Sequence, residues 1–472
     1  MQRRVTTAQL QRLLPPAEPG DAAYAWLATG VRALISDGRL PLEARVPAER
    51  DLAQALGVSR TTTAAAYDLL RREGFLTSRR GAGTFTAFPA GGIPSWSART
   101  VPPGTIDLSV AGPPAAREPF LAAAREAVEH LPRYLDTDGY DVLGLRELRE
   151  AIAGEYCGRG VPTTADEIMV TSGAQAAIAL IARVFAARGL RAVVESPTYP
   201  NALDAFRFVG ARLVGVPVTE GWDVDAFAGA LRQTGAGLAY LIPEFQNPTG
   251  LVMTEDERAA IAAAARGVGA LVVADESFVG LQLDGRASGE PPLAAFDPGR
   301  VLSVGSLSKR IWGGLRVGWI RAAPSAIQRL AAERASVDLA CSILDQLTAV
   351  RVLGDETILA DQRRALRTRR DALAAALETT LPEWTFALPP GGLSLWIAID
   401  RSNTALAAAA EAEGVRIVPG PRFGTDGALE RYLRLPFVLP PAQLEEAVER
   451  LGRAASSTAA AAGGARRLDL VV

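Results

Sequence analysis

The sequence contains one lysine, Lys309, although lysine and arginine together number 50 in its 472 residues. Every other basic residue is therefore an arginine. Arginine replaces lysine wherever only positive charge is needed, but its guanidinium stays protonated and does not form imines. The surviving lysine is a candidate nucleophile or imine-forming residue. The count alone leaves open that one lysine was retained by chance, so its neighbours decide between the two interpretations.

Histidine and cysteine are equally scarce. The single histidine, His130, ends a predicted helix before Pro132, and no nucleophile motif accompanies it. This argues against a metal site built from histidine and cysteine, and against Ser-His-Asp or Cys-His catalysis. The two cysteines, Cys157 and Cys341, make no disulfide framework and fit a reducing cytoplasm. We therefore expect no metal site, and any chemistry must depend on other side chains.

The sequence also lacks a long apolar run and a strong net charge. No stretch of about 18 apolar residues is present, and no signal peptide is recognised, so we expect a cytoplasmic protein that makes no membrane contact. The net charge is -2, so the protein as a whole does not attract nucleic acid electrostatically. A local basic patch that binds nucleic acid is still compatible with this charge. With 22% charged and 49% hydrophobic residues, the composition is that of a globular protein of several domains.

Changes in composition divide the chain into five segments. A linker rich in Pro, Gly and Ser separates a helical block from a long region in which apolar runs alternate with Ala/Leu-rich helical stretches, the pattern of an α/β fold. The tail is of low complexity, and we predict that it is disordered. The predicted segments are 1–20 (N-terminal segment), 21–86 (helical block), 87–105 (linker), 106–454 (large α/β domain) and 455–472 (tail).

The helical block has the pattern of a helix-turn-helix. A first helix has one apolar face, a short helix over 49–56 is stopped by Gly57, and Ser59 caps a third helix over 60–73. Two short β segments around a Gly-containing hairpin follow over 75–85 and predict a wing. The inward-facing residues are predicted to be Leu27, Val31, Leu34, Ile35, Ala66, Tyr67 and Leu70.

Residues 46–85, VPAERDLAQALGVSRTTTAAAYDLLRREGFLTSRRGAGTF, resemble the winged helix-turn-helix of GntR-type bacterial regulators. The resemblance implies double-stranded DNA as a partner, with the start of the third helix in the major groove. Arg60 can reach a guanine edge, while hydroxyls, helix amides and wing arginines can contact phosphates. The alternative for any one arginine is a solvated surface side chain. The DNA-contact candidates are Arg50, Ser59, Arg60, Thr61, Thr62, Thr63, Arg79, Arg80 and Gly81.

Lys309 follows a short apolar strand that ends in Ser-x-Ser-Lys, and the sequence continues as RIWGGLRVGW. This segment resembles the cofactor-lysine segment of fold type I aminotransferases, which hold pyridoxal 5'-phosphate (PLP) as an internal aldimine. The resemblance implies that Lys309 forms this aldimine and that Ser306, Ser308 and Arg316 bind the phosphate. A dianionic phosphate beside an amine needs such hydroxyl and guanidinium donors.

Other segments match the same family in the expected order. After a predicted strand, the turn 171–175 opens a helix whose amides, those of Gly173, Ala174 and Gln175, would cradle the phosphate. Tyr199 would stack on the pyridine ring, although an aromatic residue at such a place is otherwise more often part of the core packing. Asn247, in the family's Asn-Pro-Thr-Gly sequence, would bind the phenolic oxygen of the cofactor.

Asp275 ends a buried strand 34 positions before the lysine, a spacing that the family shares. It would pair with the pyridinium nitrogen and keep the ring an electron sink, although a helix-capping role is the alternative. Arg434 matches the arginine that grips a substrate α-carboxylate, with a plain ion pair as the alternative. The chain departs from the family at Ser277, where a tyrosine is common, and at Asn201, where regulatory relatives often have arginine.

The combination resembles the MocR family, in which a GntR-type DNA-binding domain is fused to an aminotransferase-like domain. The implied fold is a small α+β winged helix-turn-helix followed by a large α/β domain of fold type I. The implied function is a PLP-dependent transcription regulator that senses PLP or an amino-acid-like effector. A homodimer is also implied by the family. The alternative is an active aminotransferase with a residual DNA-binding domain.

Overall fold

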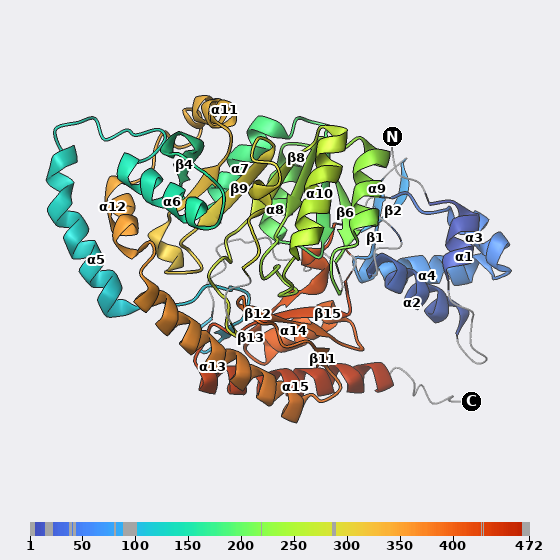
Figure 1. Ribbon diagram of the computed structural model, residues 1–472. Coiled ribbons are helices and arrows are strands. Elements are labelled where there is room, and N and C mark those ends of the chain that lie inside the picture. Colours follow the sequence, from blue (N-terminus) through green and yellow to red (C-terminus); the bar gives the residue numbers. More distant parts are fainter. Residues whose placement is uncertain are drawn as a thin grey trace. The chain divides into compact units, whose positions relative to one another are not determined.

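The chain folds into two units of different architecture (Figure 1), and each is considered by itself. One unit comprises residues 1–107, 398–433 and 454–472, and the other comprises 108–397 and 434–453. The computed structural model describes residues 5–14, 22–36, 40, 44–79, 82–87, 102–218, 220–285, 289–425, 427 and 429–464.

The helical block forms the predicted helix-turn-helix. The apolar face of the second helix is buried, and Gly57 ends the third helix with a φ of 68° in the left-handed region. The Oγ of Ser59 accepts a hydrogen bond of 3.0 Å from the Thr62 amide and caps the fourth helix. The helices are α1 (Thr7–Leu13), α2 (Ala23–Ser36), α3 (Glu49–Leu56) and α4 (Arg60–Arg72).

Two antiparallel strands make the wing. β1 (Leu76–Arg79) pairs with β2 (Gly83–Thr86), and an isolated bridge joins Arg45 to Phe85 beside them. Phe85 is fully buried, so the wing is anchored by an apolar side chain. The predicted fold class, a winged helix-turn-helix followed by a large α/β domain, is confirmed. Most of the predicted linker lies outside the described residues.

The large unit is built on a seven-stranded sheet with the order β4-β10-β9-β8-β7-β5-β6. Strand β10 is antiparallel to both of its neighbours, so β4 runs in the same direction as the five parallel strands on the other side. The strands are β4 (Ile168–Thr171), β5 (Arg191–Ser196), β6 (Arg212–Pro217), β7 (Leu238–Leu241), β8 (Leu271–Asp275), β9 (Val301–Ser306) and β10 (Gly318–Arg321).

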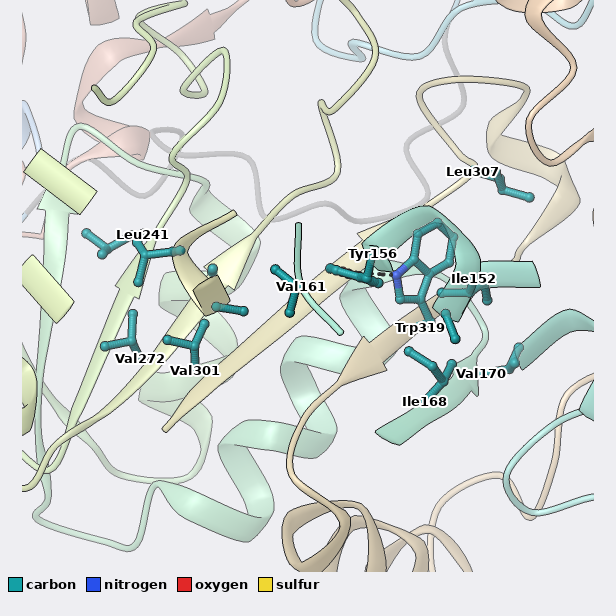
Figure 2. Packing of buried hydrophobic residues seen from close by; sticks show 14 of the residues in the cluster. Ile152, Tyr156, Val161, Ile168, Val170, Leu241, Val272, Val301, Leu307 and Trp319 are labelled. Carbon is teal, nitrogen blue, oxygen red and sulfur yellow. Dashed lines mark hydrogen bonds between the residues drawn. The ribbon is translucent and has the colours of Figure 1, made fainter. Parts of the chain in front are cut away.

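Buried aliphatic residues make this sheet the centre of the core. Strands β4, β7, β9 and β10 are buried along their whole length, as expected for a sheet covered on both faces. Figure 2 shows side chains of the cluster, among them Ile168, Val272 and Val301, with Trp319 donating a 3.3 Å hydrogen bond to the hydroxyl of Tyr156. A Cβ at position 305 would lie 2.1 Å from the Trp319 ring, so the strand before Lys309 requires glycine there.

Helices lie before, between and after these strands in the sequence, and only some of them pack against the sheet (Figure 1). They are α5 (Arg117–His130), α6 (Arg146–Gly158), α7 (Ala174–Phe185), α8 (Pro200–Phe208), α9 (Val224–Thr234), α10 (Glu255–Val268), α11 (Pro324–Arg334), α12 (Ile343–Val352) and α13 (Glu356–Thr380). Short 3-10 turns occur at Leu131–Tyr134, Ala165–Glu167, Leu293–Ala295, Gly313–Leu315 and Gly420–Phe423.

A second, four-stranded sheet has the order β11-β12-β15-β14. Residues 398–433 group with residues 1–107 in the first of the two units. Within that unit β3, which follows the linker, pairs in parallel with β13. The elements are β3 (Ile106–Asp107), β11 (Thr385–Phe386), β12 (Ser394–Ala398), α14 (Asn403–Ala412), β13 (Val415–Arg416), β14 (Val418–Pro419) and β15 (Tyr432–Pro436).

The C-terminal segment is more ordered than predicted. Helix α15 (Pro441–Gly464) continues through residues 455–464, which the low-complexity sequence had assigned to a disordered tail. Alanine has the highest helix propensity of all residues, so an Ala-rich sequence extends a helix that has already begun. Residues 465–472 lie outside the described part of the chain. No helix among the described residues has the length and apolarity needed to span a membrane.

Candidate functional sites

The predicted cofactor-binding residues gather because five strands end at one edge of the large sheet. β4, β5, β7, β8 and β9 share a direction, so their carboxyl ends lie on the same side. Asp275 ends β8, Ser306 ends β9, and Gly173, Tyr199 and Asn247 lie in the loops that follow β4, β5 and β7. Ligands of open α/β sheets bind outside this edge.

Lys309 lies at this edge, where its amine donates a 2.5 Å hydrogen bond to the carbonyl oxygen of Ala111. Burial, together with the positive charges of Arg434 and Arg316, lowers the pKa of Lys309 to about 8, while the negative charge of Asp275 opposes the change. Only the unprotonated amine is a nucleophile. The lowered pKa therefore gives Lys309 a larger reactive fraction near neutral pH than an exposed lysine has.

Asp275 is buried and held by two donors. Its Oδ2 accepts a 2.7 Å hydrogen bond from the hydroxyl of Tyr240, and its Oδ1 accepts one of 3.0 Å from the backbone amide of Ser277. Burial raises the pKa of Asp275, and these hydrogen bonds oppose the rise. The sequence did not indicate Tyr240. It lies in the apolar strand β7, so the sequence around it is that of a core strand. Its hydroxyl contacts Asp275 at the end of the neighbouring strand β8.

The residues predicted to bind the phosphate pack closely together. Gly173 has a φ of 90°, and a Cβ there would lie 2.7 Å from the guanidinium of Arg316. Arg316 itself has a left-handed φ of 56° and donates to the carbonyl oxygen of Ser172. The amide of Ser308 donates a 3.1 Å hydrogen bond to Ser306 Oγ. Gly173 also caps α7, so the amides at the N-terminus of this helix lie beside the Arg316 guanidinium.

The site fits a phosphorylated pyridine ring. Buried polar atoms without a hydrogen-bond partner among the described residues include Ser308 Oγ, Ser277 Oγ and Gln175 Oε1. Such atoms are rare in folded proteins unless a ligand or water satisfies them. Ser308 Oγ belongs to the hydroxyl-and-guanidinium set that a phosphate needs, whereas Ser277 follows the carboxylate of Asp275. The residues present therefore agree with PLP as the ligand.

Arg434 and Asn247 are buried beside each other. Arg434 Nη1 lies 3.5 Å from Asn247 Oδ1, and Nη2 donates a 2.6 Å hydrogen bond to the carbonyl oxygen of Ser109. Burial lowers the pKa of Arg434 to about 10. The hydroxyl of Tyr199 accepts a 3.1 Å hydrogen bond from Asn201 Nδ2, so the departure at position 201 still contacts the predicted stacking residue.

The predicted DNA-contact residues divide into exposed and buried ones. Ser59, Arg60 and Thr61 are exposed at the start of α4, where Thr62 is half-buried, and Arg50 is exposed in the first turn of α3. The start of α4 is the end of the helix that the helix-turn-helix geometry brings to the major groove. In the wing, the exposed Arg79 lies with its guanidinium 4.8 Å from the centre of the Phe85 ring. Arg80 and Gly81 lie outside the described residues.

The prediction for Thr63 is wrong. Its side chain is fully buried, because position 63 lies on the same helix face as Ala66, Tyr67 and Leu70, at spacings of three, four and seven residues. Its Oγ1 has no hydrogen-bond partner among the described residues. A run of three threonines suggested three equivalent hydroxyls, whereas the helical period turns the third into the core.

Thr63→Val is therefore expected to stabilise the DNA-binding domain by about 1 kcal/mol, because it removes a buried hydroxyl without a partner and keeps the shape. The affinity for operator DNA is expected to stay unchanged. Thermal unfolding and DNA titration measure the two effects. If the variant folded stably but lost affinity for DNA, Thr63 would be a DNA-contact residue after all.

Comparisons with known proteins agree with this architecture. Residues 106–451 match the family of aminotransferases of class I and II, and residues 23–86 match the gntR family of bacterial regulatory proteins. A 2-aminoadipate transaminase of Thermus thermophilus is 32% identical, over 84% of this chain and 95% of its own. The "Probable rhizopine catabolism regulatory protein MocR" of Rhizobium meliloti is 28% identical, over 82% of this chain and 84% of its own.

A solved structure gives the same result for the large domain. LysN, the α-aminoadipate aminotransferase of Thermus thermophilus in complex with N-(5'-phosphopyridoxyl)-L-leucine, superimposes with a TM-score of 0.70 at 30% identity. The match covers 79% of this chain and 97% of LysN. The fold and the site thus define a class I and II aminotransferase domain joined to a DNA-binding head. The chain belongs to the MocR family of GntR-type transcription regulators.

Proposed function

We propose that this regulator binds PLP covalently through Lys309 and that PLP, or an amino compound that reacts with it, changes its affinity for DNA. The observation that carries the proposal is the setting of the single lysine. Its pKa is lowered by burial, and the charges of Asp275, Arg316 and Arg434 act on it. The same chain exposes Arg60 at the start of its recognition helix. The DNA target places its action in the cytoplasm.

Each residue of the site has a role in this proposal. When bound, PLP supplies an electron sink and a carbonyl carbon that reacts with amines. Arg316, Ser306 and Ser308 hold the phosphate by charge-assisted and hydroxyl hydrogen bonds. Asp275 holds a proton at the pyridine nitrogen, and Tyr240 orients the carboxylate of Asp275 through the 2.7 Å hydrogen bond.

Further residues enclose the ring and select the effector. Tyr199 covers the ring face, and the side-chain amide of Asn247 binds the phenolic oxygen. Arg434 binds the carboxylate of an amino-acid-like effector, because a buried guanidinium with little water around it pairs strongly with such an anion. The leucine adduct bound to LysN is a compound of this class, which supports the assignment.

The second candidate function is an active aminotransferase with a residual DNA-binding domain. The specific observation in its favour is that Lys309, Asp275 and Arg434 occur together, and the 2-aminoadipate transaminase relative carries this activity in its name. Against it, the recognition helix keeps its cap and its exposed arginine. The exposed arginine stands at the end of the helix with which a helix-turn-helix contacts bases.

A half-transamination assay combined with DNA binding separates the two functions. The regulator proposal predicts specific binding to the intergenic DNA beside its own gene and slow conversion of bound PLP to the pyridoxamine form by common amino acids. Rapid conversion together with no specific binding to that DNA would sink the proposal in favour of the enzyme.

We further propose that the protein is a homodimer joined through its large domain. Exposed apolar side chains concentrate on α5, the turn after it, and the segments beside α11 and α12, and α5 packs against α12. Such a concentration marks a protein interface rather than ordinary surface. A second copy is the partner that every molecule of this chain has available. The residues are Leu121, Val128, Leu135, Tyr140, Val142, Val337, Leu339 and Leu344.

The double variant Val128→Asp/Leu135→Asp, whose two negative charges cannot pair with each other, is expected to convert the dimer into a monomer. Leu135 is 68% exposed in one chain, and charges at its position and at 128 would have to be buried without partners in a dimer. Sedimentation equilibrium gives the mass. Phe208→Asp is the matched control, since Phe208 is 86% exposed on α8 outside this surface, and it should leave the mass unchanged. A monomeric wild-type protein, or a dimeric double variant, contradicts the proposal.

A further inference from the structure

Glu195 is a fully buried carboxylate at the end of β5 that the proposed chemistry does not use. Its Oε1 accepts hydrogen bonds of 2.8 Å from Trp222 Nε1 and 3.1 Å from the amide of Ile242. Its Oε2 accepts bonds of 3.0 Å from Gln246 Nε2 and 3.3 Å from Thr198 Oγ1. All four donors are uncharged, so the ionised carboxylate is stabilised by hydrogen bonds alone.

These bonds join two loops of the candidate cofactor site. Thr198 precedes Tyr199 in one loop, and Gln246 precedes Asn247 in the other. Gln246 strengthens the connection, because its Nε2 also donates a 2.7 Å hydrogen bond to the carbonyl oxygen of Pro197. The carboxylate and this amide are thus the direct connection between the loop of the stacking tyrosine and the loop of the asparagine.

The orientation of the Gln246 side chain is fixed. Its Oε1 accepts bonds of 3.1 Å and 2.8 Å from the amide and hydroxyl of Thr249. A rotated amide would place its own N–H groups against the Thr249 amide, which is a donor only. Gln246 can therefore only donate toward Glu195, and Glu195 must accept.

We propose that Glu195 is a positioning residue of the PLP site, which fixes the loop of Asn247 against the loop of Tyr199 through Gln246. The inference rests on the proposed function, since Tyr199 and Asn247 must hold one ring from its face and from its edge. A misplacement of such groups by about 1 Å is enough to weaken binding strongly.

The energetics support a role in the site over a role in stability. Burial raises the pKa of Glu195 to about 7 from an ordinary value of 4.5, and the hydrogen bonds oppose the rise. Because the folded pKa is the higher one, the ionised carboxylate opposes folding above pH 4.5, and this effect is complete above about pH 7. Tyr240, the titratable group that faces it from β7, adds no positive charge. An uncharged side chain at position 195 would avoid this unfavourable contribution to folding, so stability alone does not explain a carboxylate there.

Glu195→Gln tests the connection with almost no change of shape. Trp222 and Ile242 are both donors, so the carbonyl oxygen of the substituted amide must face them. Its N–H groups then face Thr198, whose hydroxyl can accept, and Gln246 Nε2, which cannot. The substitution therefore breaks the bond between Glu195 and Gln246 selectively.

The test is the affinity for PLP, measured on the full chain by quenching of tryptophan fluorescence. Glu195→Gln is expected to weaken PLP binding about tenfold without lowering the melting temperature by more than about 2 °C at pH 8. The matched control is Glu257→Gln. Glu257 Oε1 accepts a 3.3 Å hydrogen bond from the Trp222 amide, and its Oε2 caps the start of α10 at Thr254. Among the described residues it has no hydrogen bond to residues 197–201 or 245–250, so its substitution should leave PLP affinity unchanged.

A double-mutant cycle distinguishes positioning from general damage. In the Asn247→Ala background, Glu195→Gln should weaken PLP binding by less than about twofold more, because its effect acts through Asn247. In the Ser308→Ala background, the full effect of about tenfold should remain. Equal losses in both backgrounds, or wild-type affinity of Glu195→Gln, overturn the inference. If Glu195→Gln does not fold, Gln246→Ala cuts the same connection from the other loop and must show the same cycle. A wild-type protein that binds no PLP contradicts the proposed function instead.

Discussion

Lys309→Ala is expected to abolish covalent attachment of PLP completely. Wild-type protein incubated with PLP and reduced with borohydride should gain the mass of one cofactor per chain, and the variant should gain none. The chain suits this measurement unusually well because Lys309 is its only lysine, so the α-amine is the sole other amine that reduction can label. The physical reason is that arginine side chains, however many, form no imine.

Lys309→Arg is the matched control for charge. It keeps a cation at the same position and loses only the nucleophilic amine, so it should also gain no mass. Retained attachment in either variant would show that Lys309 is not the residue that binds the cofactor. If Lys309→Ala lost the covalent attachment of PLP and Lys309→Arg kept it, the positive charge rather than the amine would be responsible. That result would also contradict the assignment.

Arg60→Ala is expected to weaken operator binding strongly and to relax its sequence specificity. Arg60 is the exposed first residue of the recognition helix, and loss of one good guanine contact costs about 1–3 kcal/mol, or about 5- to 150-fold in affinity, with relaxed specificity at that base pair. Titration of operator and of scrambled DNA at one salt concentration measures both quantities.

Arg72→Ala is the matched control for Arg60→Ala, because Arg72 is an exposed arginine at the opposite end of the same helix. It removes the same charge far from the end that enters the groove. Operator affinity should change little in this variant. Equal losses in both variants would mean that Arg60 contributes only long-range charge and reads no base.

Much of the architecture was predictable because local patterns and chain order specify it. The strand predicted to end at Asp275 does end there, and the helix predicted over 49–56 agrees with the structure residue for residue. The cap at Ser59 and the end at Gly57 follow from local backbone chemistry. The gathering of Gly173 and Asp275 at one sheet edge follows from parallel strands.

The misses share a physical cause, which is that contacts across the fold leave no local signal. Thr63 looks like its two threonine neighbours, and only the packing of α4 shows that it faces inward. Tyr240 and Glu195 lie in apolar strands. Asp275, the partner of Tyr240, is 35 positions away in the sequence, and Gln246, the partner of Glu195, is 51 positions away. The hydrogen bonds that give these side chains a role therefore become visible only in three dimensions.

Lys309 links the proposed PLP site to the proposed control of DNA binding. The proposed function requires that events at Lys309 change the behaviour of the DNA-binding domain, which is a coupling free energy between two sites. Such couplings amount to about 1–3 kcal/mol, or about 5- to 150-fold in affinity. A regulator without this coupling would carry an aminotransferase fold for some other purpose.

The most direct test is the operator dissociation constant of the wild-type protein measured with and without PLP, beside that of Lys309→Ala. The account predicts that PLP changes the wild-type constant by at least about fivefold and leaves the constant of the variant unchanged. Identical constants for the wild-type protein with and without PLP, and with an amino compound added, would contradict it.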